Sequence, residues 1–158
     1  MLAQAHAMLS YPSSSVAAAL ARPRHPWTVS LDGDGRTHLA RVGLTVGRLP
    51  IYKHVRLRVG ASTASLRSDS VMLPVSWEAV GGPPIFPGME GTLHVEPFGP
   101  GGSRLTLNAT YEPPLGKLGE LIDRTLMHRF AHATMSDFVD RLAAALSAEL
   151  GSGVFSDG

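Results

Sequence analysis

Apolar and polar residues alternate along most of the chain, and only the last third shows a longer period. Alternation with a period of two predicts β-strands whose side chains point to opposite faces of a sheet. Glycine, proline and polar residues separate the alternating segments, as expected for turns between antiparallel strands. The segments that we expect to be strands are 27–31, 37–46, 51–59, 70–80, 92–98 and 103–111, preceded by a weakly alternating stretch at 2–11.

Helical patterns occur in two places. A short alanine-rich helix is predicted over 16–21, because serines precede it and prolines follow it. A much longer helix is predicted from Leu118 to Leu150, between a pair of prolines and Gly151. Strands and helices do not alternate in the βαβ order that is typical of a parallel sheet. The predicted fold class is therefore α+β, an antiparallel sheet packed against helices.

The apolar face of the long helix changes along its length. At about 100° per residue, the two halves place their apolar side chains about half a turn apart. We expect the change between Met127 and Ala131, with the first half covering a cavity and the second half packing on the sheet. The apolar positions are Leu118, Leu121, Ile122, Leu126 and Phe130 in the first half, and Met135, Phe138, Val139, Leu142 and Leu146 in the second.

Two histidines, His128 and His132, lie at this predicted change of face. Their spacing invites comparison with the zinc motif H-E-x-x-H, but Arg129 stands where that motif has its glutamate. Two histidines without a third ligand make a weak metal site, so we expect no metal. Surface histidines are the favoured interpretation, and side chains that face the cavity are the alternative.

Other candidate motifs are less informative. One face of a predicted strand carries His54, Arg56 and Arg58. The favoured interpretation is that this face is the solvent side of a half-buried strand. The alternative is a basic patch that docks an acidic partner such as a carrier protein. The glycine-rich segments 33–35 and 99–102 precede strands rather than helices, so they are turns and not phosphate loops. No G-x-S-x-G segment positions a serine nucleophile.

Composition narrows the class of protein. The 158 residues suit one domain, which we place at 1–150, with a flexible tail at 151–158. A net charge of +1 provides no field for nucleic acid, and the chain has no cysteine for disulfides or thiolate metal sites. Neither a signal peptide nor an apolar run of membrane-spanning length is visible. We expect a soluble cytoplasmic protein with no nucleic acid partner, no integral membrane association and no cofactor.

The amino-acid sequence of the last third resembles that of the START-like superfamily, also called SRPBCC or helix-grip, which includes polyketide cyclases and birch-pollen-allergen-like proteins. The segments that carry the resemblance are Tyr111 to Gly116, Leu118-Gly119, Ile122 to Arg124 and Phe138 to Leu142. The resemblance implies a curved antiparallel sheet of six or seven strands wrapped around the C-terminal helix, with a cavity between them for lipids, polyketides or other apolar molecules. The chain departs from the group at its front, where there is little room for a second short helix.

Three functions are compatible with these observations. The leading hypothesis is a non-catalytic protein that binds a hydrophobic or amphipathic small molecule in the cavity, as a monomer or a homodimer. The alternative is a polyketide aromatase or cyclase that uses His128, His132, Tyr111 or Glu78 as acid or base. The third is an interaction domain without a cavity. The predicted ligand-binding residues are Val75, Trp77, Leu93, Val95, Leu107, Ala109, Tyr111, Ile122, Leu126 and Phe130, together with His128 and His132, and with Ile85 and Phe86 of a loop at 81–91 that guards the entrance.

Overall fold

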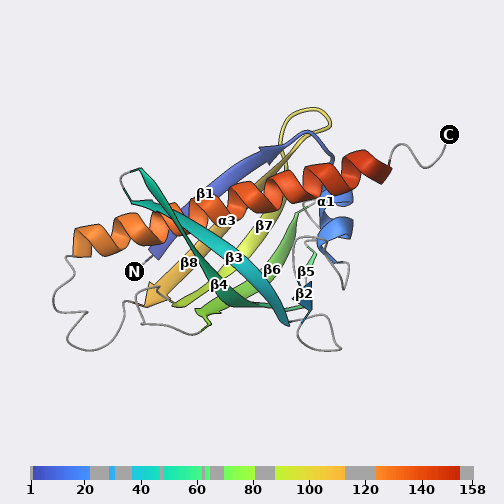
Figure 1. The fold of residues 1–158 in the computed structure, drawn as a ribbon. Coiled ribbons are helices and arrows are strands. Elements are labelled where there is room, and N and C mark those ends of the chain that lie inside the picture. Colours follow the sequence, from blue (N-terminus) through green and yellow to red (C-terminus); the bar gives the residue numbers. More distant parts are fainter. Residues whose placement is uncertain are drawn as a thin grey trace.

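One antiparallel sheet and one long helix make up most of the structure (Figure 1). This computed structural model describes residues 2–21, 29–30, 37–46, 48–61, 63–64, 70–80, 88–112 and 124–153. The strands follow the order β1-β8-β7-β6-β4-β3-β2, and β5 pairs with β6. The predicted α+β class, with an antiparallel sheet and a C-terminal helix, is confirmed. The elements are β1 (Leu2–Leu9), α1 (Ser13–Leu20), β2 (Val29–Ser30), β3 (Thr37–Val46), β4 (Leu49–Val59), β5 (Thr63–Ala64), β6 (Val71–Ala79), β7 (Gly88–Pro97), β8 (Ser103–Glu112) and α3 (Arg124–Gly153).

The strand count differs from the predicted six or seven. Eight strands are present in the described part of the chain. Seven of them overlap the predicted segments, although β2 covers only Val29–Ser30 of the predicted 27–31. The eighth is the two-residue strand β5, which lies between the predicted strands 51–59 and 70–80 and is too short to show a period of two. The predicted loop at 81–91 is also too long, since β7 already begins at Gly88; residues 81–87 lie outside the described part.

The two faces of the sheet differ in chemistry, as the alternation predicts. Residues that pair directly across neighbouring strands share a face, and the rows behind α3 are apolar. One such row runs Leu57, Trp77, Met89 and Tyr111 across β4, β6, β7 and β8, and all four side chains are buried. Adjacent rows on the opposite face carry threonine, asparagine, histidine and charged residues. We call these the inner face and the outer face.

The buried face of α3 is continuous from Met127 onward. Buried side chains recur every three or four residues, at Met127, Ala131, Met135, Phe138, Leu142 and Leu146, which is the spacing of a single stripe on a helix. No change of face occurs between Met127 and Ala131, because both side chains lie on this stripe; Phe130 lies half-buried at its margin. The predicted apolar face of the first half depended also on Leu118, Leu121 and Ile122, which lie outside the described residues, and on Leu126, whose side chain is not described. A different face before Met127 therefore stays a prediction.

The sheet closes around α3 from both margins. The helix lies close to β1 at one end of the strand order and to β3 near the other end, and Figure 1 shows it running alongside β1 across the sheet. The small buried side chains Ala3 and Ala5 of β1 allow this close approach. Helix α1 packs beside the C-terminal half of α3, where the Tyr11 hydroxyl donates a hydrogen bond to the Ser147 carbonyl at 3.3 Å.

The C-terminal end of α3 lies beyond the predicted one. The helix continues through Gly151 to Gly153, so the first three residues assigned to the tail are helical. Among the described glycines, only Gly99 and Gly101 have positive φ, at 66° and 71°. Gly151 therefore does not adopt the left-handed conformation with which a glycine commonly ends a helix. The two glycines that do adopt it form the turn between β7 and β8, as the sequence predicts.

A close approach between β7 and β8 occurs at Gly91. A Cβ atom added there would lie 2.4 Å from the Asn108 carbonyl oxygen and 2.6 Å from the Ala109 Cβ. Glycine inside a strand often marks such a contact with a neighbouring backbone. Gly88, in the same strand, has much more space, because its nearest neighbour would be the Trp77 carbonyl oxygen at 3.7 Å.

We predict that Gly91→Ala lowers the free energy of unfolding by about 1–3 kcal/mol, because the added methyl group forces β7 and β8 apart. Urea denaturation monitored by circular dichroism checks this. Gly88→Ala is the matched control and should stay within about 0.5 kcal/mol of the native chain. Equal stability of the two variants would contradict the close approach.

Candidate functional site

The inner face of the sheet holds most of the predicted ligand-binding residues. Seven of them are buried between the sheet and the helices, each at most 5% exposed. They come from three strands that are neighbours in the sheet, so the predicted set forms one continuous layer. These residues are Val75 and Trp77 of β6, Leu93 and Val95 of β7, and Leu107, Ala109 and Tyr111 of β8.

The predicted ligand-binding residues of the helix and of the loop are not all buried or described. Phe130 is half-buried against this layer, whereas His128 and His132 are exposed. Leu126 lies in α3, but only its backbone is described. Ile85, Phe86 and Ile122 lie outside the described residues.

Tyr111 places a polar group within the apolar layer. Its side chain is 1% exposed, and its hydroxyl oxygen lies 3.4 Å from Nδ1 of His128. Burial raises the pKa of the Tyr111 hydroxyl, because ionisation would place a negative charge away from water. The hydroxyl is therefore protonated at neutral pH. Since His128 is exposed, this pair connects a buried hydroxyl with the solvent.

Trp77 supplies a second polar group in the same cross-strand row. Its indole ring lies 5.0 Å from the Phe138 ring, between centroids, so the side chain is held between β6 and α3. Within the described part of the structure, the buried Nε1–H group has no hydrogen-bond acceptor. A buried donor without a partner costs about 1–3 kcal/mol. The sequence identified Trp77 as a lining residue, but no sequence signal reveals whether its N–H group is paired.

Trp77 and Tyr111 are separated by one strand. Met89 of β7 pairs with both of them, so their Cα atoms are two strand spacings apart, roughly 10 Å. The candidate site is therefore an apolar layer that contains one unpaired N–H donor and one protonated hydroxyl group. Small-molecule sites have this character, with few oriented polar groups among apolar side chains.

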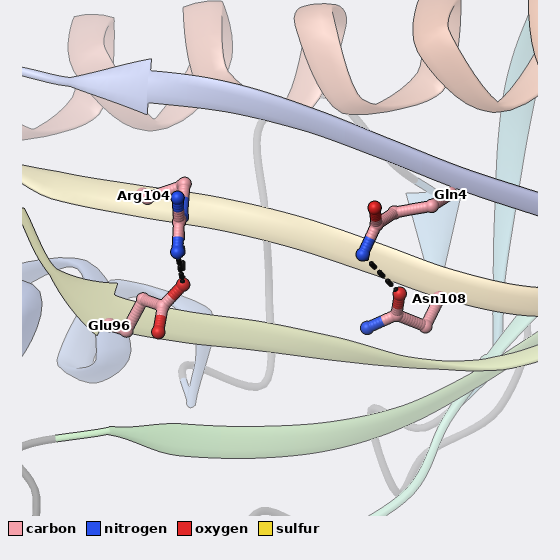
Figure 2. A network of polar contacts seen from close by, with 4 residues as sticks. All are labelled: Gln4, Glu96, Arg104 and Asn108. Carbon is pink, nitrogen blue, oxygen red and sulfur yellow. Dashed lines mark hydrogen bonds and ion pairs between the residues drawn. The ribbon is translucent and has the colours of Figure 1, made fainter.

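The outer face carries a polar depression of about 400 Å³ across β1, β8 and β7. Figure 2 shows the two cross-strand pairs at its sides. Gln4 Nε2 donates to Asn108 Oδ1 at 2.7 Å, and Arg104 Nε donates to Glu96 Oε1 at 2.7 Å. His6, Thr106 and His94 form one cross-strand row between the pairs; they line the depression together with the four paired residues.

A second outer-face depression, of about 250 Å³, contains the predicted basic residues Arg56 and Arg58. Arg56 Nη1 lies 2.8 Å from Glu78 Oε1, and Arg58 Nη2 lies 3.7 Å from the same atom. Both arginines and His54 are on the outer face, which agrees with the interpretation of a solvent side. Glu78 belongs to this charged surface and does not reach the inner layer.

No group of three metal-ligating side chains comes together among the described residues, and the only predicted pair, His128 and His132, is exposed. No helix in the described part of the chain is both long and apolar enough to cross a membrane.

Comparison with known proteins identifies the fold. No family model and no curated protein sequence matches the chain. Solved structures match over nearly its whole length. A conserved protein from Geobacillus kaustophilus has a TM-score of 0.58 at 16% identity, covering 94% of this chain and 96% of its own. The Zhui aromatase/cyclase from Streptomyces sp. R1128 has a TM-score of 0.55 at 13% identity, covering 100% and 98%.

Norcoclaurine synthase from Thalictrum flavum has a TM-score of 0.50 at 11% identity, covering 91% of this chain and 84% of its own. At these identities the likeness concerns the fold alone. The chain has the fold of the START-like superfamily, and the predicted resemblance is confirmed at that level.

We predict that Tyr111 makes the native protein sensitive to alkali. Because burial raises its pKa above the usual 10.0, the unfolded chain loses this proton first. The contribution of the group to stability is complete below the unfolded pKa, and it is lost as the pH rises through the higher folded pKa. Above about pH 10, the free energy of unfolding should therefore fall more steeply for the native chain than for Tyr111→Phe.

Urea denaturation at a series of pH values measures this difference. Tyr11→Phe is the control, because it removes a hydroxyl that is only half-buried. The steep fall should persist in the control. Parallel curves for the native chain and Tyr111→Phe would mean that the Tyr111 hydroxyl ionises as in water.

Proposed function

We propose that the chain binds an apolar or amphipathic small molecule, such as a lipid or a polyketide, between the inner face of its sheet and α3. The observation that carries the proposal is the Tyr111 hydroxyl, 3.4 Å from His128 Nδ1 and otherwise set in a buried apolar layer. A polar group in such a position orients a bound molecule, while the apolar layer supplies its affinity.

The balance of energies favours a molecule with a large apolar surface. Burial of apolar surface stabilises a complex by about 25 cal/mol per Å². The loss of translational and rotational freedom opposes this gain, so a small or strongly polar molecule would bind weakly. Besides Trp77 and Tyr111, the polar residues among the described buried ones are Ser13, Ser103 and Thr134, and none of the five carries a charge that would attract an ionic ligand.

A cyclase-type enzyme is the second candidate, and the contact between Tyr111 and His128 favours it. A neutral tyrosine hydroxyl can donate a hydrogen bond to a ketone, while an imidazole can accept the proton that is released on enolisation. The likeness to an aromatase/cyclase supports the same chemistry. Of the four predicted acid or base residues, Tyr111 and His128 are the two whose side chains lie within 3.4 Å of each other; Glu78 is on the outer face, where it contacts Arg56.

We expect saturable one-to-one binding of N-phenyl-1-naphthylamine, an uncharged fluorescent probe, at the inner face. In methyl NMR spectra recorded during the titration, the resonances of Val75, Leu93 and Leu107 should shift, because these side chains belong to the apolar layer. The methyl groups of Thr92 and Thr106 on the outer face are the internal control. Unsaturable binding, or shifts restricted to the outer face, would contradict the proposal.

If the chain is a cyclase, Tyr111→Phe and His128→Asn should each lower the turnover of a carrier-bound poly-β-keto substrate by about 10²–10⁴-fold, because each removes one partner of the proton transfer. Product formation measured by chromatography checks this. His6→Asn, which changes an exposed histidine on the outer face away from the basic patch, should leave turnover unchanged. Full activity of both site variants would exclude this mechanism.

A further inference from the structure

The Trp77 indole is an unusual donor to find in an apolar layer. It is 4% exposed, and no acceptor for its N–H group exists among the described residues. Ser103 is the other such case, but its hydroxyl rotates and lies at the far end of β8 from Tyr111. Large buried polar groups nearly always have a partner, so the Trp77 N–H group calls for a specific explanation.

The described neighbours of Trp77 offer no acceptor for its N–H group. Leu57 and Met89 flank it in the cross-strand row, and the Phe138 ring packs against it from α3. Tyr111, the other polar member of the row, is roughly 10 Å away. Since the described residues supply no acceptor, a molecule that enters the layer is the acceptor considered for this donor.

The chemistry of the donor restricts that molecule. An indole N–H group donates and cannot accept, so it selects an oxygen with a free lone pair. Buried charge requires a paired charge, and no described buried side chain is ionic. A carboxylate is therefore disfavoured, and a neutral carbonyl oxygen is the acceptor that best suits an apolar environment.

We propose that the site selects apolar molecules that carry a neutral carbonyl group, and that the Trp77 N–H group donates a hydrogen bond to this carbonyl oxygen. The inference rests on the proposed function and specifies its ligand class. It separates ketones, esters and amides, which satisfy the donor, from hydrocarbons of the same shape, which leave it unpaired.

The experiment compares 2-acetylnaphthalene with 2-ethylnaphthalene, which have nearly the same shape and differ in the carbonyl group. Isothermal titration of the native chain should give about tenfold tighter binding of the acetyl compound. In Trp77→Phe, which keeps an aromatic ring and removes the donor, the preference should disappear because the acetyl compound binds more weakly. Phe138→Leu is the matched control, since it alters the neighbouring ring and keeps the N–H group; it should retain the preference.

A measurement on the native chain makes the test independent of the folding of the variants. The indole ¹H–¹⁵N resonance of Trp77, assigned by comparison with Trp27→Phe, should move downfield on addition of the acetyl compound and not of the ethyl compound. A nuclear Overhauser contact from this proton to a bound water in the acetyl complex would overturn the inference.

The outcomes separate the two proposals. If both compounds bind with equal affinity and the indole resonance does not respond to the carbonyl group, the inference about Trp77 is wrong while the proposed binding function stands. If neither compound binds and N-phenyl-1-naphthylamine does not bind either, the proposed function fails and the inference fails with it.

Discussion

The contact between the continuous apolar stripe of α3 and the inner face of the sheet is the interaction on which the rest of the structure depends. A sheet with one apolar face needs a cover, and α3 supplies it from Met127 to Leu146. Because the helix lies close to β1 and to β3, the sheet curves around it from both margins. Small side chains such as Ala3 and Ala5, and the absence of a side chain at Gly91, make this curvature sterically possible.

This arrangement separates two kinds of polar group. On the outer face, polar side chains pair across strands, as Gln4 does with Asn108 and Arg104 with Glu96. Water competes for the hydrogen-bonding groups of such exposed pairs, so the pairs contribute little to the free energy of unfolding, and they keep this face hydrophilic. On the inner face, Trp77 and Tyr111 are removed from water. A missing or poorly aligned hydrogen bond costs more free energy there than on the outer face. In the proposed function, the inner groups are therefore the ones that select the ligand.

The sequence predicted the elements whose pattern is long and regular, and it failed where the pattern is short or ambiguous. Strand β3 occupies the predicted residues 37–46, because ten alternating positions are hard to mistake. Strand β5 was missed, since two residues carry no period. The change of face in α3 was predicted from the positions of five apolar residues, of which only the Phe130 side chain is described; it lies half-buried beside a stripe that already includes Met127 and Ala131.

The candidate site, too, could be predicted only in part: the sequence indicates which residues face inward, but not whether their polar atoms are paired. Alternation alone assigned Val75, Leu107 and other residues to the inner layer, because the side-chain period of a strand decides which face a residue occupies. Whether a polar atom in that layer is satisfied depends on its distances to atoms from distant segments. Trp77 meets Phe138, and Tyr111 meets His128, across separations that no local pattern encodes. The indole N–H group, which has no acceptor among the described residues, and the contact between the hydroxyl and the imidazole are therefore properties of the fold, and the proposed function depends on them.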